Sequence, residues 1–250
     1  MTLQCPYGGR IFGPKDARVA VVLNNLGVLY QNQGRYELAR QLHTRALAVR
    51  EGLLGQEAQR LYERALAVWE KALGPNHPDV APGLNNLASL YFSRHKYGEA
   101  EKLYRRALEI DETHLGPAHS VIASDLNNLG TIHYVRHQYV EAEQYYARSI
   151  AMYERTAGRD NPTLADPLLN LAILYTAERR FAESAPLYLR ALPLRERVLG
   201  AEHPKLAEAL ENYAVVMRKL EEYAEAEKAQ VRATRIRVRM ALRAESEAGQ

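Results

Sequence analysis

Pairs of asparagine between leucines are the most regular polar feature of this 250-residue chain. The tetrapeptide LNNL occupies residues 23–26, 84–87 and 126–129, and LLNL and LENY hold the corresponding places at 168–171 and 210–213. An asparagine amide has both a donor and an acceptor, so it can match one peptide unit of a ligand without reading the ligand's side chains. The second residue of each pair gives the series Asn25, Asn86, Asn128, Asn170 and Asn212.

Histidines are the other candidates for chemistry, because His133 and His137 have the four-residue spacing of metal ligands on a helix. Their run, HYVRH, lacks the glutamate of the metalloprotease motif, and the repeat pattern puts His133 in the core and His137 in a turn. His77, His119 and His203 fall in separate repeats and are expected to cap helices. The sequence also lacks a phosphate-binding loop, a dinucleotide fingerprint and a nucleophile elbow. We expect no enzyme activity, no metal and no cofactor.

Composition narrows the class of protein further. The chain is 47% hydrophobic and 25% charged, which is ordinary for a globular protein. The net charge of +3 is too small to indicate a nucleic-acid partner, and the single Cys5 excludes a disulfide framework. No apolar run approaches the ~18–20 residues of a membrane span, and the N-terminus lacks a signal sequence. These features predict a cytoplasmic protein with no membrane partner.

The elements that position the asparagines follow from an internal period of 42 residues, which separates Asn86, Asn128, Asn170 and Asn212. Within one period, Leu84, Leu87, Ala88 and Tyr91 fall on one face of a helix, and a second helical pattern begins at Tyr97. Each unit is therefore predicted to be two antiparallel helices, A and B, joined by a short turn around residues 94–96. Gly116, in a left-handed conformation, is expected to end helix B.

These patterns resemble the tetratricopeptide repeat family. The residues Leu87-Ala88-x-x-Tyr91 in helix A, and Ala100, Tyr104 and Ala107 in helix B, have the family's spacing. The family's usual unit has about 34 residues, and the longer unit with its LGPxHP loop is similar to the repeats of kinesin light chains and nephrocystin-type proteins. The resemblance implies an all-α fold, a right-handed α-solenoid of helix hairpins with about eleven helices.

The period is broken once, because Asn25 and Asn86 are 61 residues apart. Residues 57–78 align with 99–120, so residues 57–73 are predicted to be a helix B that lacks its helix A. This half-repeat would directly follow another helix, predicted at 35–53. The alternative is one irregular hairpin over 36–73 that turns at Gly55. The resulting division is a flexible arm at 1–15 and a repeat domain at 16–246, with units near 16–55, 57–76, 77–118, 119–160, 161–202 and 203–246.

The A helices of such a stack line its concave side, and in peptide-binding members of the family an asparagine at this position bonds the ligand backbone. The resemblance thus assigns Asn25, Asn86, Asn128, Asn170 and Asn212 to peptide binding. The alternative is that these side chains solvate the groove or bond neighbouring helices. A second series, Asn24, Asn85 and Asn127, is interrupted by Leu169 and Glu211. Ser89, Phe92, Thr131 and Tyr134 are candidate specificity positions, whereas the family's clamp for a terminal carboxylate is missing.

The last helix is expected to run past residue 240, because Leu242 replaces the terminating glycine. Its arginines, at 232, 235, 237, 239 and 243, indicate a solvated capping helix or else a basic docking strip. The function predicted for the whole chain is a non-catalytic scaffold that binds a protein or peptide partner. The alternatives are a structural module that self-associates through its end faces, a fragment of a larger protein and, less favoured, a nucleic-acid binder.

Overall fold

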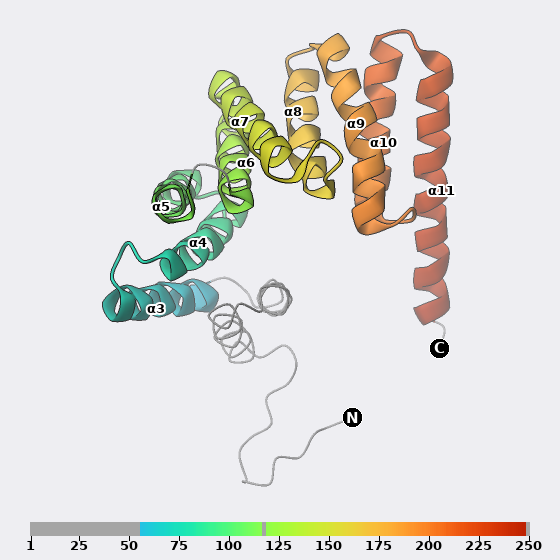
Figure 1. The fold of residues 1–250 in the computed structure, drawn as a ribbon. Helices are drawn as coiled ribbons and strands as arrows, with labels where there is room; N and C mark the ends of the chain where they lie inside the picture. Colours follow the sequence, from blue (N-terminus) through green and yellow to red (C-terminus); the bar gives the residue numbers. More distant parts are fainter. Residues whose placement is uncertain (1–55, 117–118, 249–250) are drawn as a thin grey trace. The chain divides into compact units, whose positions relative to one another are not determined.

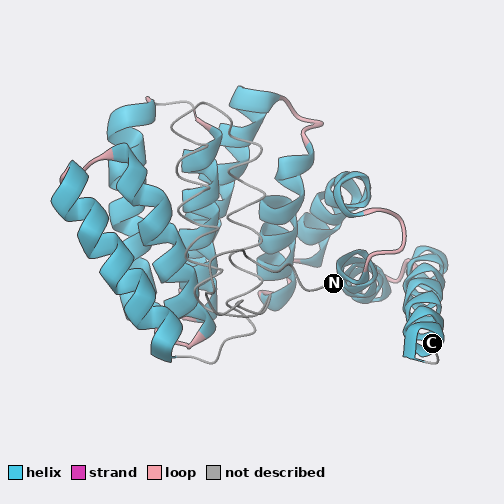
Figure 2. Cartoon of the chain, turned by 90° about the horizontal axis from the view of Figure 1, so that it is seen from below, coloured by secondary structure: helices cyan, strands magenta, loops and turns pink. Residues whose placement is uncertain are grey.

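Helices account for nearly all of the structure, a computed structural model that describes residues 56–116 and 119–248 (Figure 1). These residues form nine α-helices and two short 3-10 helices, with no strand among them (Figure 2). The all-α prediction is confirmed. The predicted total of eleven helices includes helices before residue 56, which lie outside the described residues together with the arm at 1–15 and Asn25.

The chain divides into two compact units, residues 1–95 and 96–250, which we describe separately. In the first, α3 (Gln56–Leu73) packs against α4 (Ala81–Ser93), which follows the 3-10 helix Pro78–Val80. The predicted helix 57–73 corresponds to α3. Contact between the two helices depends on Gly83, because a Cβ there would lie 2.6 Å from Cζ3 of the Trp69 ring.

The second unit is a series of antiparallel hairpins: α6 pairs with α7, α8 with α9, and α10 with α11 (Figure 1). Successive hairpins are joined by contacts of α7 with α8 and of α9 with α10, and α5 packs on α6. Nearest-neighbour packing of this kind is how repeat stacks are stabilised. The helices are α5 (Tyr97–Leu115), α6 (Ser120–Val135), α7 (Tyr139–Ala157), α8 (Ala165–Ala177), α9 (Phe181–Leu199), α10 (Pro204–Lys219) and α11 (Tyr223–Ala248).

Helix ends follow the sequence prediction closely. The Nδ1 atoms of His119 and His203 accept hydrogen bonds from the backbone N–H two residues on, at 3.2 and 3.1 Å, and His77 does the same at 3.2 Å. Gly116 has the expected positive φ of 76°, but its ψ of 174° lies outside the left-handed helical region. This combination of angles is essentially restricted to glycine. The helix therefore ends at Gly116 as predicted, but the predicted left-handed helical conformation was wrong in ψ.

The core of the second unit consists of the apolar faces that the period identified. Leu126, Leu129 and Leu168 are fully buried on the A helices, and Tyr146 of α7 is 1% exposed. The Tyr146 ring lies against Gly130 of α6, and its hydroxyl donates to Thr131 Oγ1 at 3.2 Å. The A helices are therefore held with their leucines inward, which leaves the asparagines between them to face away from the core.

Candidate functional site

The asparagines of α6, α8 and α10 lie at the boundary between core and solvent. Asn127, Asn128, Asn170 and Asn212 are all partly exposed, whereas the leucines beside them are buried. In the first unit, Asn86 of α4 is also partly exposed. Each of these asparagines is therefore partly open to solvent, and their role toward a ligand remains a prediction.

A cavity of about 320 Å³ opens among these helices. Apolar side chains of α8 and α10 share it with amides and with charges of both signs, and two residues come from α9. The lining residues are Asn127, Asp166, Leu169, Asn170, Ile173, Tyr188, Arg195, Lys205, Glu208, Ala209 and Asn212. Most of these residues are polar, so the cavity offers hydrogen-bonding groups and charges beside a smaller apolar surface.

Two of the amides are bonded to each other across the cavity. The Nδ2 atom of Asn170 on α8 donates to Oδ1 of Asn127 on α6, at 2.9 Å. The sequence left bonding to a neighbouring helix open as the alternative role, and Asn170 adopts it. An amide has a donor nitrogen and an acceptor oxygen, so this bond does not use Nδ2 of Asn127 or Oδ1 of Asn170. The linked pair therefore still offers one group of each kind.

The cavity takes Asn127 from α6, although the sequence emphasised Asn128. Asn127 belongs to the second asparagine series, which the sequence treated as interrupted. Asn127 faces α8 because of how α6 and α8 are shifted relative to each other. The residue pattern of one helix does not predict that shift. The signal that could have indicated it is the LNNL pair itself, since only one of two adjacent residues can face a given neighbour.

An ion pair lies at the edge of the cavity. Arg195 of α9 holds Asp166 of α8 through Nη1 and Oδ1 at 2.9 Å. The arginine side chain is 16% exposed and the aspartate side chain is 66% exposed. The cavity thus combines a largely buried cation with an accessible anion, and Lys205 and Glu208 on α10 add one charge of each sign.

The predicted specificity positions are partly engaged in packing. Thr131 Oγ1 donates to Asn127 O at 3.0 Å. The ring centroids of Tyr134 and Tyr139 are 5.8 Å apart. In the first unit, Ser89 Oγ donates to Asn85 O at 3.0 Å and Phe92 is partly buried. Their role toward a ligand remains a prediction.

His133 is a core residue, as the sequence predicted. It is 5% exposed and stacks on Tyr145, with 5.1 Å between ring centroids. Its Nδ1 lies 2.9 Å from Gln138 Oε1, and its Nε2 lies 3.3 Å from Arg105 Nη2, which can only donate. Both ring nitrogens are therefore engaged within the protein. Across residues 56–116 and 119–248, no three histidine, cysteine, aspartate or glutamate side chains form a group that could hold a metal.

The arginines of α11 are mostly bound to glutamates of its neighbours. Arg232 pairs with Glu196 of α9 at 2.6 Å, and Arg237 pairs with Glu211 of α10 at 2.8 Å. Arg239 and Arg243 both contact Glu202 in the loop between those helices. The hydrogen bond from Arg237 holds the pKa of Glu211 below its usual value. These arginines attach α11 to the stack rather than forming a uniformly free basic strip.

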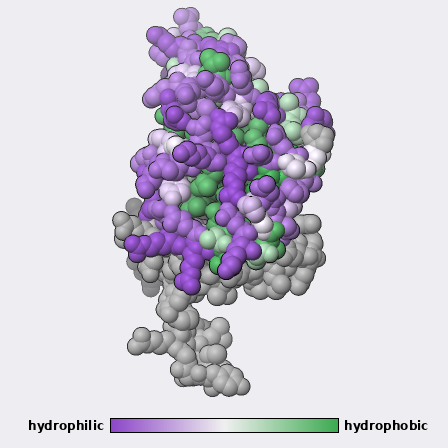
Figure 3. Space-filling view, turned by 90° about the vertical axis from the view of Figure 1, so that its left-hand side faces the viewer, coloured by the Kyte–Doolittle hydropathy of each residue, from purple (hydrophilic) through white to green (hydrophobic). Residues whose placement is uncertain are grey.

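The surface shown in Figure 3 is coloured by hydropathy. The described side chains visible in Figure 3 are mostly hydrophilic, and apolar ones gather in small separate patches. No helix in the described part of the chain combines the length and apolar character needed to cross a bilayer.

Comparison with known proteins gives one consistent family. A tetratricopeptide repeat profile matches residues 53–113, 121–196 and 164–237, and a second profile with the same description matches 19–57. No curated protein matches the sequence significantly.

Several solved structures share the fold. BtubC (BKLC) from P. vanneervenii is 23% identical, with a TM-score of 0.71 over 90% of this chain and 89% of that one. A Podosopora anserina putative kinesin light chain with nearly identical TPR-like repeats is 19% identical, with a TM-score of 0.61 over 93% and 99% of the two chains. MamA is 15% identical, with a TM-score of 0.53 over 86% and 96%.

Proposed function

The chain belongs to the tetratricopeptide repeat family, and from this premise we propose that it is a non-catalytic scaffold that binds an extended segment of a partner protein. Repeats of this family generally serve protein–protein interaction, and the concave faces of such stacks form extended binding surfaces. The proposed segment lies along α6, α8 and α10, where the 320 Å³ cavity is found.

The observation that carries the proposal is the amide pair of Asn127 and Asn170, joined at 2.9 Å. A peptide carbonyl of the ligand accepts from Asn127 Nδ2, and a peptide N–H donates to Asn170 Oδ1. Leu169 and Ile173 provide apolar contact for the ligand's side chains. Asn212 and Asn128 extend the same backbone recognition within the second unit. Asn86, in the first unit, and Asn25 stay predictions from the sequence.

Charge in the cavity argues against nucleic acid as the partner. Binding to a phosphate backbone depends on a concentration of cations, whereas this cavity sets Asp166 and Glu208 beside Arg195 and Lys205. A cavity whose four charges balance and which contains three amides suits a polypeptide backbone, which carries dipoles and no net charge.

Self-association is the second candidate, and the outer face of α11 favours it. Val231, Val238 and Leu242 are 50%, 52% and 59% exposed and fall at i, i+7 and i+11, on one side of the helix. Sedimentation of the chain over a range of concentrations separates the two candidates. A dimer that Val238→Lys converts to a monomer supports self-association, and a monomer at all concentrations leaves the scaffold function.

A peptide array followed by amide substitutions tests the scaffold function. For a peptide found on the array, Asn127→Ala and Asn170→Ala should each weaken binding by about 1 kcal/mol, the usual net value of one hydrogen bond. Titration calorimetry, at a temperature where every variant is folded, gives the affinities. Gln144→Ala on α7, also an exposed amide but outside the cavity, is the control and should leave affinity unchanged. A peptide that binds all four proteins equally would refute the proposed site.

A further inference from the structure

Helix α9 contains two prolines in its interior, Pro186 and Pro193, although it is continuous over 19 residues. Proline is the least favourable residue inside a helix, because it has no N–H to donate to the carbonyl four residues before it. The carbonyl oxygens of Ala182 and Leu189 therefore lack the donor that a helix normally supplies. The sequence of α9 thus leaves two backbone acceptors open.

The prolines and the residues with open carbonyls form one exposed stripe on α9. Ala182, Pro186, Leu189 and Pro193 fall at i, i+4, i+7 and i+11, which is one side of the helix. All four side chains are exposed, Leu189 by 56%, and none of them is charged. We call these residues the α9 stripe. A surface that breaks the rules for a stable, solvated helix indicates a contact with another molecule.

Helix α11 has the corresponding stripe one period later. Its residues, all exposed, are Ala224, Lys228, Val231 and Arg235, which we call the α11 stripe. Two cations thus replace the two prolines. Within the described part of the chain Arg235 has no ion pair or side-chain hydrogen bond, unlike the arginines that attach α11 to its neighbours. The Lys228 side chain is 77% exposed, and its Nζ lies 3.5 Å from a carboxylate oxygen of Glu225.

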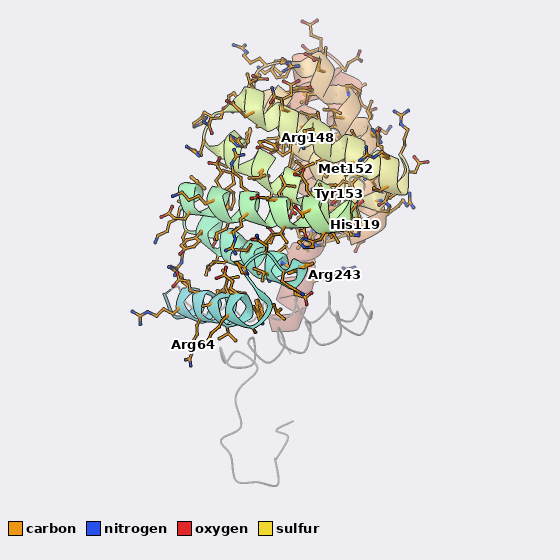
Figure 4. All side chains as sticks on the ribbon, turned by 60° about the vertical axis from the view of Figure 1, so that its left-hand side comes forward. Arg64, His119, Arg148, Met152, Tyr153 and Arg243 are labelled. Atoms are coloured by element: carbon orange, nitrogen blue, oxygen red, sulfur yellow. The ribbon has the colours of Figure 1, made fainter. Side chains whose placement is uncertain are left out.

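The two stripes belong to neighbouring helices. The B helices of the second unit are joined to one another by arginine–glutamate pairs. Arg232 of α11 pairs with Glu196 of α9 at 2.6 Å, and Arg148 of α7, labelled in Figure 4, pairs with Glu112 of α5 at 3.5 Å. Since α9 and α11 are equivalent helices of successive hairpins, they run in the same direction and their stripes face the same way.

The acceptors of α9 and the donors of α11 lie at matching levels along their helices. In a helix, the carbonyl of one residue points to the level of the residue four positions on, so each open carbonyl lies at the level of its proline. Arg235 and Lys228 hold those two levels in α11, and both can only donate. Leu189 of α9 has Val231 of α11 at its level. The two stripes are therefore complementary, although they cannot face each other within one copy.

We propose that a second copy of the chain covers this surface in a two-fold dimer, with α11 of each copy over α9 of the other. A two-fold axis parallel to the helices, between α9 and α11, exchanges the two stripes without a shift along the helices. Arg235 then donates to the partner's Leu189 O, and Lys228 donates to the partner's Ala182 O. Val231 covers the partner's Leu189, and each contact is made twice.

This dimer specifies the self-association for which α11 is the candidate, and it is independent of the proposed peptide site on α6, α8 and α10. Pairing of α11 with α11 would leave the α9 stripe uncovered, so variants in α9 distinguish the two arrangements. Sedimentation of the full chain over a range of concentrations gives the dissociation constant of the dimer.

Pro193→Ala tests the open carbonyl. Alanine supplies an N–H that bonds Leu189 O within α9, and it stabilises the helix, so a weaker dimer could not result from unfolding. The dissociation constant should rise about tenfold or more, because one hydrogen bond is lost at each of two equivalent places. If Pro193 served only local structure, the constant would not change, and that result would overturn the proposal.

Leu189→Lys tests the apolar contact. It sets a further cation beside the partner's Arg235 and Lys228, so the variant should be a monomer at every concentration. Ala147→Lys is the matched control, because Ala147 is the exposed residue at the same position of α7, outside both stripes. The control should dimerise like the parent. A parent that is monomeric throughout, or a dimer that survives Leu189→Lys, would overturn the proposal.

Failure of the dimer and failure of the peptide site give different results. Leu189→Lys should bind the array peptide with the parent's affinity, because the cavity lies on the A helices. Asn170→Ala should dimerise with the parent's dissociation constant while its affinity for the peptide falls. A dimer lost in Asn170→Ala would contradict the placement of the interface on α9 and α11.

Discussion

Replacing Tyr146 with alanine should destabilise the protein by about 3–5 kcal/mol, the usual cost of removing a large aromatic from a core. Tyr146 is 1% exposed, and its ring fills the space between α7 and α6 over Gly130. The cavity left behind is bordered by helix backbone, which can collapse only in part. Chemical denaturation followed by circular dichroism measures the loss.

Tyr146→Phe separates the ring from the hydroxyl. This variant removes only the bond from the hydroxyl to Thr131 Oγ1, 3.2 Å long, and should cost about 1 kcal/mol. An alanine variant as stable as the phenylalanine variant would mean that the ring does not support the α6–α7 hairpin.

Gly130→Ala should destabilise the protein by about 1–3 kcal/mol, because it overpacks the same contact. A Cβ at Gly130 would lie 2.7 Å from both Cδ1 and Cε1 of Tyr146, and the buried ring has little room to move. Thermal unfolding of the variant and the parent measures the difference.

Gly98→Ala in α5 is the matched control. A Cβ at Gly98 meets no atom within 4 Å, so the higher helix propensity of alanine should raise stability, by up to about 1 kcal/mol. The two substitutions are chemically identical, and equal effects from them would contradict the close contact at Gly130.

The hairpins were predictable because helix pairing in a repeat stack is a local property. The 42-residue period fixes which face of each helix is apolar, and the histidine caps and the turns recur with it. The helix at 57–73 was also predictable, because residues 57–78 align with a helix B elsewhere in the chain, and α3 spans Gln56–Leu73.

Contacts between helices were harder to predict, because they depend on how neighbouring helices are offset. The sequence identified Asn170 as facing the groove, but neither its bond to Asn127 nor the pairing of the α11 arginines with Glu196, Glu202 and Glu211 follows from a single-helix pattern. The burial of Asp111, which is 4% exposed at a position that holds Trp69 and Tyr153 in other units, was missed for the same reason.

The position of Asp111 holds a different residue in each unit, and this restricts which units can be deleted without loss of stability. Loss of one whole unit, residues 119–160, would keep the period intact and set Asp111 opposite Pro167. A buried carboxyl would then face a ring without a donor or acceptor side chain, at a cost that the helical pattern alone does not reveal. Units of equal length are therefore not interchangeable, because each one packs best against its own neighbours in the chain.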